Sequence, residues 1–137
     1  MAVVKSKRKK SELEVLTKAR KLAAHTINMC NNEKMFPKRR RWQITGDIVN
    51  QARTVHNCIR KGNSVFVKID NDYKLRRDYQ NMALAEVDAL LGNMDLAYEI
   101  LKVSAKRLDY WVGLAIEVQA LIRAWRKSDY DRYNHLV

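Results

Sequence analysis

The sequence predicts an all-α protein, an antiparallel up-down-up-down four-helix bundle. Only four glycines and one proline occur among 137 residues, few for a β protein with many tight turns. Apolar residues recur at three- and four-residue spacing in four segments that short connections join, and this pattern is typical of a helical bundle. We expect three parts: a disordered basic arm (1–10), the four-helix bundle (11–128) and a frayed C-terminal tail (129–137).

The first helix is expected to begin at Ser11, which forms an S-x-x-E capping box with Glu14. Asn31 and Asn32 suit its end. Pro37 is expected to start the second helix, because the N–H that proline lacks is unpaired at the first helical position anyway. The predicted apolar stripe of the first helix comprises Val15, Leu16, Ala19, Leu22, Ala23, Thr26, Met29 and Cys30.

The second helix is expected to end near Arg60, with Lys61-Gly62-Asn63 as its stop signal. The linker 63–70 contains the apolar patch Val65-Phe66-Val67, which we expect to cap one end of the core; a small hairpin is the alternative. The predicted stripe of the second helix comprises Ile44, Ile48, Ala52, Val55 and Ile59.

The third helix is expected to be the longest, with Asp70, Asn71 or Asp72 as its cap. Gly92 within it costs about 1 kcal/mol relative to alanine, which close helix packing or a bend would explain. Ser104 is the expected N-cap of the fourth helix. The third stripe comprises Tyr79, Met82, Ala83, Val87, Leu90, Met94, Ala97 and Leu101. The fourth, with the most regular heptad, comprises Leu108, Trp111, Ala115, Val118, Ile122 and Trp125.

The motifs searched for give no indication of an enzyme, a cofactor or a metal site. Neither an E-x-x-H pair nor a Gly-rich phosphate loop is present, and the three histidines are scattered. Cys30 and Cys58 are expected to be free thiols, because they would lie roughly 25 Å apart along a hairpin. A secretory segment and an apolar run of about 18 residues are both missing, so we expect a soluble cytoplasmic protein that does not enter membranes.

The charge favours a polyanionic partner. The chain carries 27 Lys and Arg against 15 Asp and Glu, a net charge of +12. Eleven basic residues are predicted to bind RNA or DNA, mainly through phosphates: Lys34, Lys38, Arg39, Arg40, Arg41, Arg53, Arg60, Lys61, Lys74, Arg76 and Arg77. The run at 38–41 follows Pro37, where a helix dipole favours anions rather than cations. A solvated basic surface is the alternative. Trp42 beside the run is a candidate base-stacking platform, and the sequence leaves its exposure open.

Several short segments carry a family resemblance: Val15-Leu16-x-x-Ala19-x-x-Leu22, Phe36-Pro37-Lys38, Leu90-Leu91 and Leu121-Ile122-Arg123-Ala124-Trp125. Their order over about residues 12–127 resembles the accessory variability determinants of diversity-generating retroelements, and the related proteins encoded by intervening sequences in bacterial 23S rRNA genes. The chain departs from the family where Arg123-Ala124-Trp125 replaces a frequent Gly-Gly-Trp or Gly-Ser-Trp.

The resemblance implies a homopentameric, barrel-like assembly that binds the retroelement's reverse transcriptase and its template RNA. Its role would be to support mutagenic reverse transcription without catalytic residues of its own. The residues independently suggest a homo-oligomer, because Leu114 and Leu121 lie outside the heptad of the fourth helix. They also leave open an oligomeric protein-interaction scaffold that binds no nucleic acid, and an enzyme as the third and least supported class.

Overall fold

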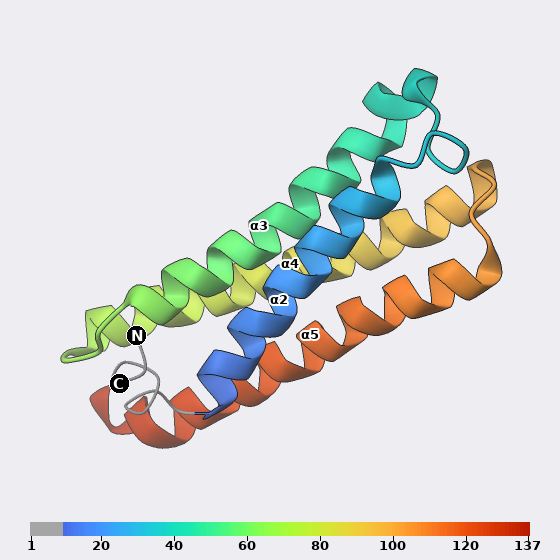
Figure 1. The fold of residues 1–137 in the computed structure, drawn as a ribbon. Helices are drawn as coiled ribbons and strands as arrows, with labels where there is room; N and C mark the ends of the chain where they lie inside the picture. The colour runs from blue at the N-terminus through green and yellow to red at the C-terminus, as the bar shows by residue number, and fades with distance from the viewer. Residues whose placement is uncertain (1–9) are drawn as a thin grey trace.

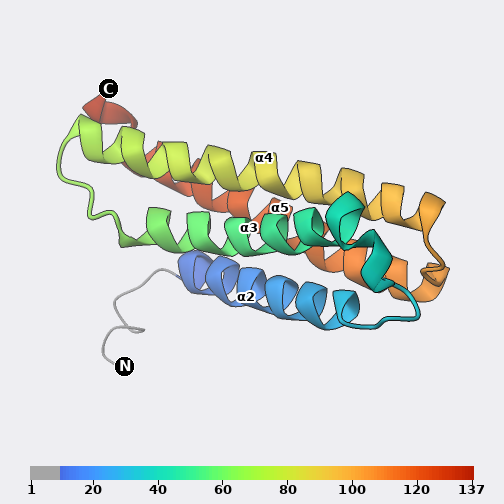
Figure 2. The same ribbon diagram turned by 90° about the horizontal axis from the view of Figure 1, so that it is seen from above.

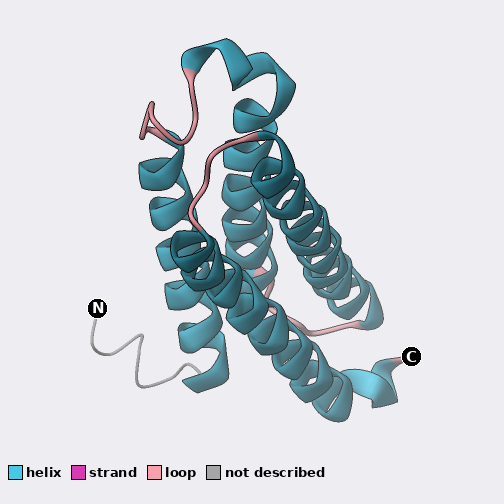
Figure 3. Cartoon of the chain, turned by 90° about the vertical axis from the view of Figure 1, so that its right-hand side faces the viewer, coloured by secondary structure: helices cyan, strands magenta, loops and turns pink. Residues whose placement is uncertain are grey.

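The computed structural model describes the backbone of residues 10–137 and the side chains of 14–137, and this part of the chain is a four-helix bundle (Figure 1). The predicted basic arm and the Ser11 side chain therefore lie outside the described part, apart from the backbone of Lys10. Figure 3 shows no strand among the described residues. The four long helices are α2 (Lys10–Cys30), α3 (Gly46–Ser64), α4 (Asp70–Ile100) and α5 (Ala105–Tyr133).

The helices run up and down in chain order, and each packs against two others (Figure 2). Helix α2 contacts α3 and α5, and α4 contacts the same two helices from the other side. The predicted all-α class and bundle architecture are confirmed. Two tryptophans of α5, Trp111 and Trp125, are fully buried in the core.

Trp111 links α5 to α2 through a buried polar chain. Its indole Nε1 donates to the Thr26 hydroxyl at 2.8 Å, and that hydroxyl donates to the carbonyl of Leu22 at 2.7 Å. The indole N–H is therefore paired although the side chain has no contact with solvent. The predicted stripe of the fourth helix is confirmed, with Leu108 at its half-buried end.

The prediction that Met82 of α4 lies in the core is wrong. Met82 is half-exposed, whereas Gln80 and Ala83 on either side of it are fully buried. Successive helical residues point about 100° apart, so a core face centred on these two positions turns Met82 outward. Tyr73 and Arg76 extend the same buried face toward the start of α4, and the sequence did not predict this.

The prediction that Pro37 starts the second helix is only partly confirmed, because α3 begins at Gly46 and two other helical turns precede it. Pro37 has the extended backbone angle ψ of 145°, then Lys38–Arg40 form a 3₁₀ turn and Arg41–Thr45 form a π turn. The amide of Gly46 donates to the carbonyl of Arg41, and a Cβ on Gly46 would lie 3.2 Å from that oxygen. Glycine thus accommodates the wide turn that precedes α3.

The predicted stop signal at Gly62 is wrong, because α3 continues to Ser64. Gly62 is buried in the helix, where a Cβ would lie 3.0 Å from the ring of Trp125. Glycine is therefore explained here by close contact with the Trp125 ring of α5 and with Tyr79 of α4. The linker patch forms no strand, so the alternative of a small hairpin is wrong. The prediction that the patch caps the core is also wrong for Phe66, which is 77% exposed.

The N-terminal caps predicted for α4 and α5 are confirmed in part. Asp72 is the capping residue, since its Oδ2 accepts from the backbone amides of Lys68 and Ile69 at 3.0 and 3.1 Å. The Ser104 hydroxyl oxygen accepts from the amide of Arg107 at 3.2 Å, as expected of an N-cap. Close packing does not explain Gly92, which is exposed and around which a Cβ would meet no atom of the described chain within 4 Å.

The prediction of a frayed tail after Ser128 is wrong. Helix α5 continues to Tyr133 and is followed by a 3₁₀ turn over Asn134–Leu136. Asp129 is buried, and its carboxylate forms an ion pair with α4 that holds this end of α5 in place.

Candidate nucleic-acid interface

The eleven basic residues predicted to contact nucleic acid occupy different environments. Nine are exposed, Arg40 is half-buried and Arg76 is buried. The guanidinium of Arg40 donates to Gln43 Oε1 at 2.9 Å, so this side chain is directed along the corner. The exposed group is divided between the two ends and the outer faces of the bundle.

The prediction that Arg76 contacts phosphates is wrong. Its side chain is 5% exposed and donates to both carboxylate oxygens of Asp129, at 2.6 Å from Nε and 3.0 Å from Nη2. Gln80 Nε2 donates to the same carboxylate at 2.7 Å, and the guanidinium lies 5.3 Å from the ring centre of Trp125. Position 76 faces α5, so its charge is used within the fold.

The Pro37 corner, residues 31–45, keeps its cations at the surface. Lys38 forms an exposed ion pair with Glu33 at 3.3 Å, a kind of contact that adds about 0–1 kcal/mol. Arg39 and Arg41 are exposed. Trp42 beside them is 93% exposed, so packing against the bundle is ruled out for this indole.

The Pro37 corner is attached to the core through Phe36. Phe36 is buried and meets Trp111 edge to face, with ring centres 6.0 Å apart. The corner and the loop from α4 to α5 lie at the same end of the bundle, at the upper right of Figure 1. Arg107 Nη1 reaches Met35 Sδ at 3.5 Å across this end.

A second basic surface lies at the opposite end, in a groove of about 490 Å³ between the start of α4 and the last turns of α5. We call it the α4–α5 groove. No acidic side chain occurs among the described residues that line it, which are Tyr73, Arg77, Arg123, Arg126, Lys127 and Tyr130. Arg126 donates to Asn81 Oδ1 at 2.8 Å, and Lys127 pairs with Asp131 just outside at 3.4 Å.

Sequence reasoning found only Arg77 of these four cations. Arg123, Arg126 and Lys127 were not predicted to contact nucleic acid. A signal was present: residues 123, 126, 127 and 130 follow i, i+3, i+4, i+7 spacing, which places them on one face of a helix. That face approaches Arg77 only because α4 and α5 are neighbours.

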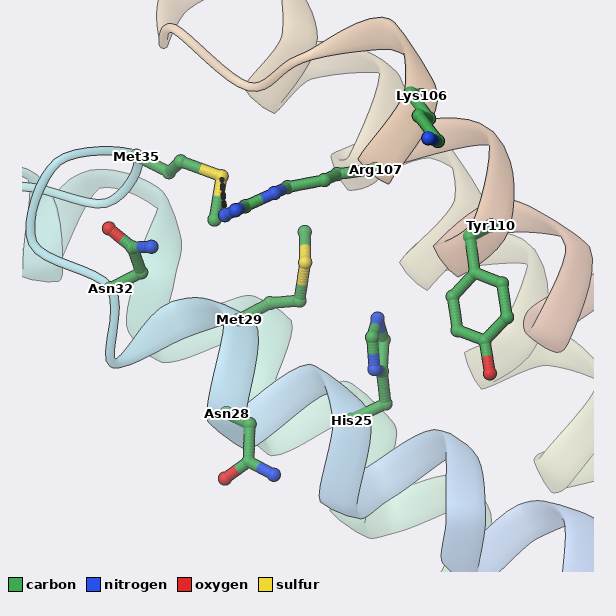
Figure 4. A pocket seen from close by; sticks show the side chains of 8 residues that line it. All are labelled: His25, Asn28, Met29, Asn32, Met35, Lys106, Arg107 and Tyr110. Carbon is green, nitrogen blue, oxygen red and sulfur yellow. Dashed lines mark hydrogen bonds between the residues drawn. The ribbon is translucent and has the colours of Figure 1, made fainter.

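Another hollow, of about 530 Å³, lies between the second half of α2 and the start of α5 (Figure 4). We call it the α2–α5 groove. His25 and Tyr110 meet edge to face in it, with ring centres 5.0 Å apart. Burial lowers the pKa of His25, and the charge of Lys21 lowers it further. The lining residues are His25, Asn28, Met29, Asn32, Met35, Lys106, Arg107 and Tyr110.

The described residues hold no group of three His, Cys, Asp or Glu side chains that could bind a metal ion. Cys30 and Cys58 are free and buried, as predicted, and burial raises the pKa of the Cys30 thiol to about 12. Glu117 pairs with Lys18 at 3.1 Å.

Among residues 10–137, none of the helices combines the length and the apolar character that crossing a membrane requires.

Comparison with known proteins gives no match: no family model, no curated protein and no solved structure is significantly similar to this chain.

Proposed function

We propose that this chain is a non-catalytic protein that binds RNA or DNA through two basic surfaces at opposite ends of its bundle. We further propose that it serves as the accessory subunit of a diversity-generating retroelement, binding the reverse transcriptase and the template RNA in the cytoplasm. The nucleic-acid part is supported by one observation above all, the four cations in the α4–α5 groove. The retroelement part is supported by the sequence resemblance alone.

Nucleic acid fits the α4–α5 groove in charge and shape. Like charges that share a groove repel one another, and phosphates reverse the sign of that interaction. Arginine guanidinium groups bind phosphate oxygens through two parallel hydrogen bonds. Tyr130 exposes its ring beside the cations, and an aromatic ring in a basic groove is the combination that single-stranded nucleic acids use for stacking.

The Pro37 corner offers the same combination. Trp42 is exposed in the π turn Arg41–Thr45, while the other two tryptophans are buried in the core. An indole in water gains by stacking against a base, and Lys38 and Arg39 are placed to contact the flanking phosphates. Because Trp42 is the accessible tryptophan, quenching of its fluorescence by added RNA would report binding at this corner.

The decisive measurement is the salt dependence of RNA binding, followed by fluorescence anisotropy of a labelled single strand. Replacing Arg77, Arg123 and Lys127 with glutamine should weaken binding and reduce the slope of log affinity against log salt by about two units, since each contact with a single strand contributes about 0.7. Arg126 is left in place because it bonds to Asn81.

A variant with Arg20, Lys68 and Lys102 changed to glutamine is the matched control. It loses the same charge from exposed positions that line neither groove. If the control loses as much affinity as the groove variant, the effect is one of net charge and the groove is not a site. If the wild type binds no RNA or DNA at low salt, the nucleic-acid proposal is wrong.

A second candidate, an oligomeric protein-interaction scaffold, is supported by the outer face of α4. Leu75, Met82, Ala89 and Leu96 lie seven residues apart and are all exposed, and such a heptad stripe is typical of helix–helix contacts. Gly92, in the same face, would let a partner helix approach closely. Leu114 and Leu121 do not support an interface: Leu114 is buried and Leu121 packs against the core.

We propose that this stripe joins copies of the chain, with five copies as the number the resemblance implies. Met82→Glu places a charge in the centre of the stripe and should release monomers. Light scattering that gives the wild type a mass near 16.1 kDa, that of one chain, would contradict the assembly. Oligomers that bind no nucleic acid would favour the scaffold over the first proposal.

A further inference from the structure

The α2–α5 groove has an apolar interior that the fold leaves open. Met29 and Met35 are buried at its sides, and Tyr110 exposes about half of its surface. His25 Nε2 is buried there and makes no hydrogen bond with the described residues. In Figure 4 the imidazole of His25 stands between Met29 and Tyr110 and points toward the middle of the groove. An unpaired polar atom in an apolar hollow suits a ligand that carries a hydrogen-bonding group on a flat, apolar body.

Charge around the groove limits what that ligand is. Lys106 and Arg107 line one side, and Lys34 lies on the turn next to Asn32. Trp42 has the most exposed of the large apolar side chains that the structure describes, and its indole would fit the groove by size if it came from a second copy. It would bring the cations of its own corner against those of the groove, and this like-charge contact disfavours a second copy. The occupant therefore combines a flat apolar part with negative charge.

We propose that the α2–α5 groove receives one unpaired base of a single-stranded RNA or DNA, with Tyr110 against the base and Lys106 and Arg107 on the flanking phosphates. The inference rests on the proposed nucleic-acid binding and assigns a specific subsite to it. A hollow of about 530 Å³ falls within the range of sites that enclose small organic ligands, about 300–1,000 Å³.

Two polar groups are placed to meet the edge of such a base. His25 Nε2 is the first. Asn32 is the second: its Oδ1 accepts from the amide of Lys34 at 3.0 Å, which fixes the side chain, and Figure 4 shows its amide nitrogen on the side of the groove. Asn28 also lines the groove, but its amide points away from the interior in the same view. Arg107 is held in reach of the groove by its contact with Met35.

The test is a double-mutant cycle between protein and RNA. The wild type and Tyr110→Ser are titrated with a labelled single-stranded RNA and with the same RNA carrying abasic nucleotides, which keep every phosphate. Stacking on an aromatic side chain is worth about 1–3 kcal/mol per base, so Tyr110→Ser should weaken the intact RNA by roughly 5- to 150-fold. It should weaken the abasic RNA less than about twofold, because phosphate contacts remain.

Tyr98→Ser is the matched control, since Tyr98 is similarly exposed but does not line the groove; its affinity for intact RNA should stay that of the wild type. Lys106→Gln with Arg107→Gln should weaken intact and abasic RNA alike. The same four titrations with single-stranded DNA show whether the sugar matters.

Four results would overturn the inference in different ways. If the α4–α5 groove variant weakens RNA binding while Tyr110→Ser leaves it unchanged, the chain binds nucleic acid but this groove takes no base. If Tyr110→Ser weakens abasic and intact RNA equally, the ring does not stack on a base. If Tyr110→Ser instead dissociates oligomers seen by light scattering, the groove is a protein contact. Absence of any binding by the wild type contradicts the proposed function together with this subsite.

Discussion

The buried carboxylate of Asp129 should be the most sensitive single position for stability. Asp129→Asn keeps the size of the side chain but removes its charge and turns one acceptor oxygen into a donor. That new donor faces Arg76 or Gln80, whose nitrogen atoms lie 2.6–3.0 Å from the carboxylate oxygens and themselves donate. The guanidinium of Arg76, 5% exposed, loses the charge of the carboxylate to which it donates through two nitrogen atoms.

The expected cost follows from burial. Breaking a buried ion pair by removing one partner costs about 3–5 kcal/mol, out of a total stability of about 5–15 kcal/mol for a domain. At about 3–6 °C per kcal/mol for a chain of this length, the midpoint of thermal unfolding should fall by about 10–30 °C. Circular dichroism at 222 nm and urea titration measure the loss.

Asp131→Asn is the matched control on the same helix. Asp131 pairs with Lys127 at 3.4 Å in an exposed position, and its loss should change stability by less than about 1 kcal/mol. The combined variant Arg76→Met with Asp129→Leu replaces both charges by apolar groups and should recover most of the lost stability. If Asp129→Asn unfolds at the same temperature as Asp131→Asn, the buried pair does not hold α4 to α5 as inferred.

Three further predictions concern packing, pH and thiol reactivity. Gly62→Ala should lower the unfolding midpoint, because its methyl group would lie 3.0 Å from the Trp125 ring, whereas Gly92→Ala, with open space around it, should raise the midpoint; thermal melts of both variants decide this. Stability should decrease as pH falls below 6.5, because burial lowers the folded-state pKa of His25 and His56 beneath their unfolded value of 6.5. Protonation then favours the unfolded chain. The free energy of unfolding, measured by urea titration at pH 7.5 and at pH 5.5, should change less between the two pH values in the His25→Gln, His56→Gln double variant than in the wild type. Cys30, whose thiol pKa is raised to about 12 by burial, should not react with Ellman's reagent in the native protein, and rapid labelling of Cys30 without denaturant would contradict its burial.

The sequence predicts most reliably what local periodicity controls. The heptad from Trp111 to Trp125 appears in the structure with its interior positions buried, because spacing alone decides which face of a long helix is apolar. Gly62 was misread for the opposite reason. Glycine is a local stop signal, but here a ring 63 positions away along the chain, that of Trp125, decides why no side chain fits.

The candidate site was predicted where it is continuous in sequence and missed where it is not. The run from Lys38 to Arg41 is visible in the sequence, and the structure keeps most of it exposed. The α4–α5 groove required knowing that the start of α4 meets the end of α5. Arg76 was misassigned because its partner, Asp129, was expected in a frayed tail.

Neighbouring arginines at the start of α4 thus have opposite roles, and this separation bears on the proposed interface. Arg76 and Arg77 point about 100° apart on the helix, so one lies inside against Asp129 and the other lines the α4–α5 groove. Asp129 is the buried acid nearest in sequence to the groove cations of α5, and its carboxylate is already bound by Arg76 and Gln80. Asp129 therefore does not pair with the groove cations of α5, and the buried pair between Arg76 and Asp129 links the two walls of the groove. A groove with fixed walls loses less conformational entropy when a phosphate backbone binds than one that must assemble on contact.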